Sequence, residues 1–150
     1  MKMAEPTNLS DRRGNTSQRI QHMLDERKQL LALLLQVSSL KNAEVEDISN
    51  ELLEEFCQVL VDYIAAGHFG LYERIVEKRE RRKRVADLAI KIYPRIDATT
   101  QIALDFNEKY DSCNGKLSLS SIQEDLSMLG EELTARIELE DKLIESLIST

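Results

Sequence analysis

ELLEEFCQVLVDYIAAGHFGLYERI, residues 51–75, carries apolar residues at intervals of three and four. This spacing matches the turn of an α-helix and places the apolar side chains on one face. The pattern extends from about Glu46 to about Arg81. Gly67 is its weak point, because glycine costs about 1 kcal/mol relative to alanine inside a helix. The stretch predicts one long amphipathic helix, and its continuity through Gly67 stays open.

The rest of the chain repeats this periodicity. Three further segments are predicted to be helices: about residues 17–40, 84–111 and 118–148. Pro94 lies inside the second of these and is expected to bend or interrupt it, because proline cannot donate the helical hydrogen bond. Residues 112–118 contain Asn114-Gly115 and predict a turn. Residues 1–16 lack the periodicity and are expected to be a mobile lead-in.

The pattern predicts an all-α fold. Four amphipathic helices with short connections are typical of an up-down-up-down four-helix bundle with long helices. The 150 residues include only 5 Gly and 2 Pro, few for a protein rich in hairpins. No stretch alternates apolar and polar residues as a strand would. We expect a single helical-bundle domain over residues 17–150, after the lead-in of residues 1–16.

The net charge of −7 hides a basic run, KRERRKR at residues 78–84. Removing its six positive and one negative charges leaves 14 Lys and Arg against 26 Asp and Glu, a balance of −12. So acidic a protein is expected to attract basic surfaces and repel nucleic acid, so no direct DNA binding is expected. The run itself either complements a helix dipole and is solvated, or binds nucleic acid or an acidic protein.

The two cysteines, Cys57 and Cys113, form neither a metal motif nor a disulfide framework. Cys57 lies in an apolar stretch and is expected to be a reduced core thiol. The polar N-terminus lacks the apolar region of a signal peptide. The longest apolar run, residues 30–35, has six residues, far fewer than the roughly 20 of a membrane span. A cytoplasmic protein that does not enter membranes is expected.

The sequence predicts no catalytic residue, metal or cofactor, and hence no enzyme. The residues three before His22 and His68 are not glutamates, so the Glu-x-x-His pairs of di-iron bundles are missing. No glycine-rich phosphate loop, serine elbow or zinc motif is present. A histidine-phosphotransfer domain is an alternative, but His68 is followed by a bulky Phe69 rather than by lysine and small residues. The role of His68 stays open.

Placing the second helix at 100° per residue separates two faces. The core face is expected to hold Leu53, Leu60, Ile64 and Leu71, flanked by Phe56, Cys57, Gly67 and Ile75. The opposite face holds Glu55, Asp62, Phe69 and Glu73, with Gln58 and Ala66 nearby. An exposed aromatic residue among acidic ones is typical of an anchor for a basic partner. Alternatively, Phe69 packs under the N-terminal segment, or a break at Gly67 re-aims it.

Charged residues also interrupt the apolar faces. Arg27 stands between Leu24 and Leu31 in the first helix, and Glu140 and Asp141 stand at the corresponding place in the last. An unpaired buried charge is costly. We therefore expect Arg27 to pair with Glu140 or Asp141 across the bundle.

Several phrases together resemble the regulator of sigma D family, which includes the alginate regulatory protein AlgQ (Rsd/AlgQ family). They are DERKQLL (25–31), EEFCQVLVDYIAAGHFGLYERI (54–75), YPRIDATTQ (93–101) and LGEELTARIELEDKLI (129–144). They follow the family's order and cover most of residues 20–148. The phrase DYIAAGHFGLYER is specific, since no general structural rule requires it. The run at 78–84 departs from the family by being more basic.

The resemblance implies an anti-sigma factor. Such a protein binds the C-terminal promoter-reading region (region 4) of the housekeeping sigma factor, sigma-70. It thereby sequesters sigma-70 from core RNA polymerase and from −35 DNA, and favours alternative sigma factors in stationary phase. The residues expected to contact sigma are Asp62 first, then Phe69, Tyr72 and Glu73, with Glu55 and Ala66 on the same face.

The resemblance also implies other partners, namely a sugar-phosphotransfer carrier protein and the enzyme that turns over the alarmone guanosine tetraphosphate (ppGpp). The alternative function is therefore an adaptor that regulates such an enzyme by binding it. A third hypothesis is DNA binding through residues 78–84, which predicts a steep salt dependence and is opposed by the overall charge. A monomer is expected.

Overall fold

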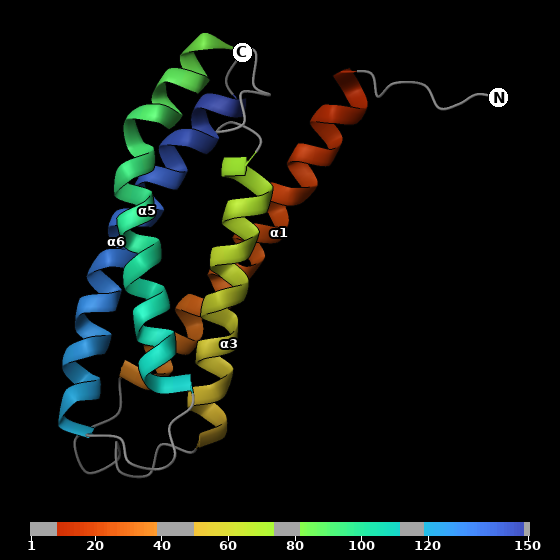
Figure 1. Ribbon diagram of the computed structural model, residues 1–150. Helices are drawn as coiled ribbons and strands as arrows, with labels where there is room; N and C mark the ends of the chain where they lie inside the picture. Colours follow the sequence, from red (N-terminus) through yellow and green to blue (C-terminus); the bar gives the residue numbers. More distant parts are fainter. Residues whose placement is uncertain (1–8, 39–49, 74–81, 112–118, 149–150) are drawn as a thin grey trace.

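The computed structural model describes residues 9–38, 50–73, 82–111 and 119–148 (Figure 1). Its elements are α1 (Leu9–Ser38), α3 (Asn50–Gly67), the π-helical segment η1 (His68–Tyr72), α5 (Lys83–Asp111) and α6 (Leu119–Ile148). η1 follows α3 directly, so the two form one long helical segment. No strand occurs in these ranges, and the predicted all-α class is confirmed.

The helices form the predicted four-helix bundle, in which each helix runs antiparallel to the one before it (Figure 1). α3 packs between α1 and α5, α5 packs on α6, and α1 also contacts α6. The N-terminal part of α1, drawn in red, leans away from the other helices (Figure 1). One end of α1 therefore stands apart from the bundle, while the rest contributes to the core.

The apolar core runs along the bundle and takes side chains from all four helical segments. The four residues predicted for the core face of the second helix are buried: Leu53, Leu60, Ile64 and Leu71. Cys57 is buried too, as expected. Phe56 of α3 meets Phe106 of α5 edge to face, with ring centroids 5.7 Å apart. Each such large side chain stabilises the fold by about 1.5–3 kcal/mol.

The predicted start of the first helix was wrong, and the interruption considered at Pro94 does not occur. α1 begins at Leu9 rather than near Ser17. Once a helix is nucleated, each further residue adds a hydrogen bond, so the amphipathic turns can extend into a segment without apolar periodicity. α5 passes through Pro94 without interruption. Pro94 is exposed, so water can bind the Ile90 carbonyl that loses its partner there.

Some predictions lie outside the described residues. They concern residues 1–8 of the lead-in, the helix start near Glu46, Ile75, most of the basic run at 78–84, and the turn at 112–118 with Cys113.

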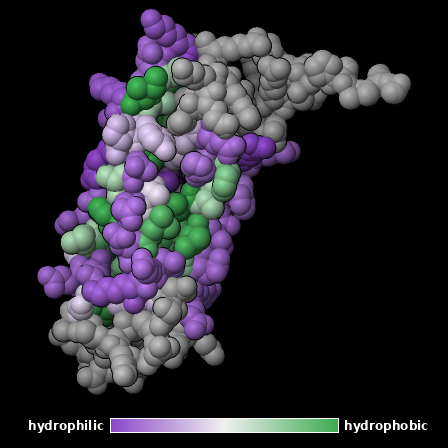
Figure 2. All heavy atoms as spheres, viewed as in Figure 1, coloured by the Kyte–Doolittle hydropathy of each residue, from purple (hydrophilic) through white to green (hydrophobic). Residues whose placement is uncertain are grey.

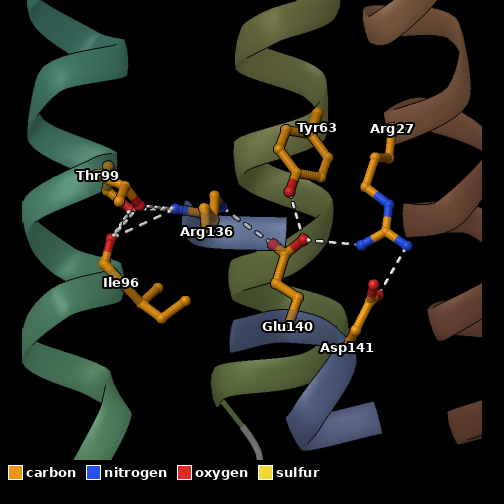
Figure 3. A network of polar contacts seen from close by, with 8 residues as sticks. Arg27, Tyr63, Ile96, Thr99, Arg136, Glu140 and Asp141 are labelled. Atoms are coloured by element: carbon orange, nitrogen blue, oxygen red, sulfur yellow. Dashed lines mark hydrogen bonds and ion pairs between the residues drawn. The ribbon is translucent and has the colours of Figure 1, made fainter. Parts of the chain in front are cut away.

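A buried ionic network crosses the middle of the bundle (Figure 3). Arg136 and Glu140 lie one turn apart in α6 with side chains 1% and 0% exposed, and Nε of Arg136 is 3.0 Å from Oε2 of Glu140. The Tyr63 hydroxyl of α3 donates a hydrogen bond to Glu140. From α1, Nη1 of Arg27 lies 3.4 Å from Oε1 of Glu140. The Glu140 carboxylate thus binds side chains from three helices, α6 itself, α3 and α1.

Arg136 extends the network to α5 (Figure 3). Its Nη1 donates to Oγ1 of Thr99 at 3.1 Å and to Oγ1 of Thr100 at 2.7 Å. The same atom lies 3.4 Å from the Ile96 carbonyl oxygen. All four helical segments therefore contribute groups to one network, and the buried guanidinium has several acceptors.

The pairing predicted for Arg27 is confirmed, with one correction. Nη2 of Arg27 lies 2.9 Å from Oδ1 of Asp141, in addition to the contact with Glu140. Glu140 is fully buried, whereas the Asp141 side chain is 56% exposed. Asp141 is therefore not a buried charge. Its side chain is partly exposed to solvent and binds the Arg27 guanidinium from the solvent side.

Burial and charge keep these groups in their usual protonation states. Burial raises the pKa of Tyr63, and the negative charge of Glu140 raises it further, so the hydroxyl stays a donor. Burial alone would lower the pKa of Arg136, but Glu140 together with the Tyr72 and Tyr63 hydroxyl groups offsets this, and the pKa is raised. Burial likewise lowers the pKa of Arg27, but the hydrogen bond to Asp141 and the negative charges of Asp141 and Glu140 together outweigh burial, so the pKa is raised. Both guanidinium groups stay charged.

Removing the Glu140 carboxylate should destabilise the fold far more than removing its neighbour. Glu140→Ala leaves Arg136 buried without its counter-charge, and we expect a loss of about 3–5 kcal/mol in the free energy of unfolding. Asp141→Ala removes an exposed partner of Arg27 and should cost about 1 kcal/mol or less. Urea unfolding followed by circular dichroism measures both variants. An equal decrease in the free energy of unfolding for the two variants would contradict the central role of Glu140 in the buried network.

Candidate functional site

The π turn of η1 changes which residues of the second helix face the core. The backbone N–H of Glu73 donates to the carbonyl of His68, five residues earlier. A π turn holds more residues than an α turn, so each residue advances by less than 100°. Tyr72, which an ideal α-helix would leave at the flank, is therefore carried onto the core face. It is only 3% exposed, next to buried Leu71.

Two glycines mark where other groups approach this turn closely. A Cβ on Gly70 would lie 3.2 Å from the backbone oxygen of Arg19 in α1. Nη1 of Arg19 also lies 3.4 Å from the carbonyl oxygen of Phe69. A Cβ on Gly67 would lie 3.2 Å from Nη2 of Arg136. Gly70 thus lets α1 pack onto the π turn, and Gly67 makes room for the buried network.

Most of the residues predicted for the outer face of the second helix do lie on its outer side. The Phe69 side chain is 59% exposed and points away from the core, as expected. Asp62 and Glu55 are exposed, while Ala66 and Glu73 are half-buried. Asp62 is held by its neighbour, because Nε2 of Gln58 donates to Oδ1 of Asp62 at 3.0 Å. The continuous helical path through Gly67 is what keeps Phe69 on this face.

Tyr72, which was predicted to contact a partner, does not lie on the exposed face with Phe69. The side chain is buried beneath the surface, and its ring centre lies 5.7 Å from the Arg136 guanidinium. Burial raises the pKa of its hydroxyl, and the charge of Glu140 adds to this. Among the described residues the hydroxyl has no hydrogen-bond partner. Tyr72 therefore supports the site from below. The other residues of the predicted outer face lie in the helical turns around Tyr72.

α1 and the second helix enclose a groove, which we call the acidic groove. Its volume is about 690 Å³. Its main polar and aromatic lining residues are Arg19, His22, Glu26, Asp62, Phe69 and Glu73. The groove lining thus contains three carboxylates and one guanidinium, with Phe69 at its edge. Glu55 lies outside the groove, two turns before Asp62 on the same helix.

Sequence reasoning missed the half of this groove that α1 supplies. Arg19, His22 and Glu26 are ordinary polar residues on the solvent side of an amphipathic helix. Only the packing of α1 beside η1 brings them opposite Asp62. His68 is exposed and touches the Phe69 ring edge-on, with ring centres 4.8 Å apart.

Two further kinds of site, a metal centre and a membrane span, are not found among the described residues. No group of three or more His, Cys, Asp or Glu side chains among them is placed to hold a metal ion. None of the helices, as far as they are described, is long and apolar enough to cross a membrane.

Comparison with known proteins assigns this helical chain to a family of regulators. The family model described as regulator of RNA polymerase sigma(70) subunit, Rsd/AlgQ, matches residues 2–148. The chain is 36% identical over 140 residues to the regulator of sigma D of Shigella dysenteriae serotype 1, covering 91% of this chain and 88% of that protein. It is also 36% identical over 146 residues to the regulator of sigma D of Salmonella newport, with 91% and 86% covered. No solved structure gave a significant match. The chain belongs to the Rsd/AlgQ family.

The same substitution at two helical glycines should have opposite effects on stability. Gly130→Ala places a Cβ at ordinary contact distance, 3.9 Å from Leu34, and should gain about 0.5–1 kcal/mol from helix propensity. Gly70→Ala forces a Cβ against the backbone of α1, and should lose about 1–3 kcal/mol despite the same gain in propensity. Thermal unfolding of both variants checks the signs. A stabilising Gly70→Ala would contradict the close packing of α1 on the π turn.

Proposed function

We propose that this chain is an anti-sigma factor that binds region 4 of the housekeeping sigma factor, using the acidic groove and Phe69. The observation that carries the proposal is a 59% exposed phenylalanine at the edge of an acidic groove. It occurs in a member of a family described by its action on the sigma(70) subunit. Region 4 reads promoter DNA, so it presents arginine and lysine side chains that suit this groove.

The chemistry of the site is that of a binding surface. Burying Phe69 against a partner contributes about 1.5–3 kcal/mol, and the carboxylates steer a basic helix towards it. Occupying the DNA-reading surface of sigma prevents its contact with −35 DNA, and a bundle of this size on region 4 also blocks docking on core polymerase. The housekeeping holoenzyme then declines and alternative sigma factors gain polymerase in stationary phase. The chain acts by binding and performs no catalytic step.

Reversing the charge at Asp62 should weaken this complex. Asp105 of α5 is a matched control, because it accepts a hydrogen bond from Gln101 four residues earlier, as Asp62 does from Gln58. Both carboxylates are exposed, but Asp105 lines neither the acidic groove nor the groove between α3 and α5. We expect Asp62→Lys to raise the Kd for purified region 4 about tenfold or more, and Asp105→Lys to change it about twofold at most. Isothermal titration calorimetry measures both.

Two results would overturn the proposal. One is the absence of binding between the wild-type chain and region 4, and the other is equal binding by the two charge-reversal variants. The alternative adaptor function predicts instead that the wild-type chain binds the phosphotransfer carrier protein or the alarmone hydrolase and not region 4. The same titration with each purified partner separates these functions.

A further inference from the structure

A second groove lies on the other side of Phe69, between the second helix and α5, and we call it the α3–α5 groove. Its volume is about 360 Å³. Its walls are mainly apolar and include Val61, Ile64, Ile96 and Leu104. Figure 2 shows apolar residues gathered in the middle of this face, over α3 and α5, with hydrophilic residues around them. Phe69 lines both grooves and so forms the ridge that separates them.

The floor of the α3–α5 groove offers no free charge to a small anion. Arg136 lines it, but its guanidinium already binds Glu140 at 3.0 Å and the Thr100 hydroxyl at 2.7 Å. The groove is instead suited to an uncharged, aliphatic group, because such a group can replace water along the apolar walls. Leu104, 40% exposed, stands at this wall with part of its side chain uncovered.

The charges at the mouth of the groove indicate what carries that group. Asp97 lines the α3–α5 groove, and Asp62 and Glu73 line the acidic groove beyond Phe69. Negative charge therefore stands on both sides of one exposed aromatic ridge. A helix laid across Phe69 can present basic residues to both sides and one aliphatic residue to the groove, since residues three or four apart share a face.

We propose that the partner surface extends over Phe69 onto α5, and that the α3–α5 groove receives one aliphatic side chain from a basic helix of sigma region 4. This rests on the proposed function and adds to it a second, apolar subsite on a different helix. The carboxylates of the acidic groove steer the basic helix, and the groove on α5 selects a helix with an aliphatic residue beside its arginines or lysines.

The proposal is tested by neutral substitutions on α5, which leave the charge of the surface unchanged. Leu104→Asn places an amide at the groove wall. Ile90→Asn is the matched control, because Ile90 is also an exposed aliphatic residue of α5, 70% exposed, but does not line the groove. With full-length variants of unchanged circular dichroism, we expect Leu104→Asn to raise the Kd for purified region 4 about tenfold and Ile90→Asn about twofold at most.

A photo-crosslinking amino acid at the same two positions gives a readout that does not depend on affinity. At position 104 it should attach to a peptide of region 4 that contains an aliphatic residue beside arginine or lysine, and at position 90 it should not. Wild-type affinity of Leu104→Asn together with weak binding by Asp62→Lys would overturn the α5 subsite and leave the proposed function standing. Wild-type affinity of both variants would overturn both.

Discussion

The structure depends on the ion pair between Arg136 and Glu140, which is buried at the centre of the bundle. Each buried charge would be costly alone, and the pair is stable only because α1, α3 and α5 supply the remaining hydrogen-bond partners. Apolar burial is not directional, whereas these hydrogen bonds and ion pairs require each helix at one height along the bundle. The network therefore sets the register of the four helical segments, and the apolar core supplies most of the stability.

The same network determines the shape of the surface above it. Arg136 needs space beside α3, and Gly67 provides it by having no side chain. The π turn that follows turns Tyr72 inward over the Arg136 guanidinium and leaves Phe69 outward. Gly70 then allows the backbone of α1 to approach and form the other wall of the acidic groove. One short segment, residues 67–73, thus belongs to both the core and the candidate site. Its inner side is packed, and on its outer side Phe69 is exposed to solvent.

Much of this arrangement could be predicted from the sequence, because helical periodicity alone assigns Leu60 and Ile64 to the core and Asp62 and Phe69 to the surface. The pairing of Arg27 was predictable since a charge in an apolar stripe requires a partner. Arg136 was missed because the neighbouring Ile137 fits the apolar stripe as well, and only packing shows that Arg136 faces inward. Tyr72 was misplaced because the angle per residue changes within the π turn, and no single residue in the sequence signals that change.

We propose that the partner binds over residues 62–73 and the adjoining part of α1. Mapping amide chemical shifts by nuclear magnetic resonance, as purified region 4 is added to the labelled chain, tests this most directly. The largest changes should fall at Asp62, Phe69 and Glu73 and at Arg19 to Glu26 across the acidic groove. Changes confined to the far part of the bundle, such as the surface of α6 around Met128, would contradict it.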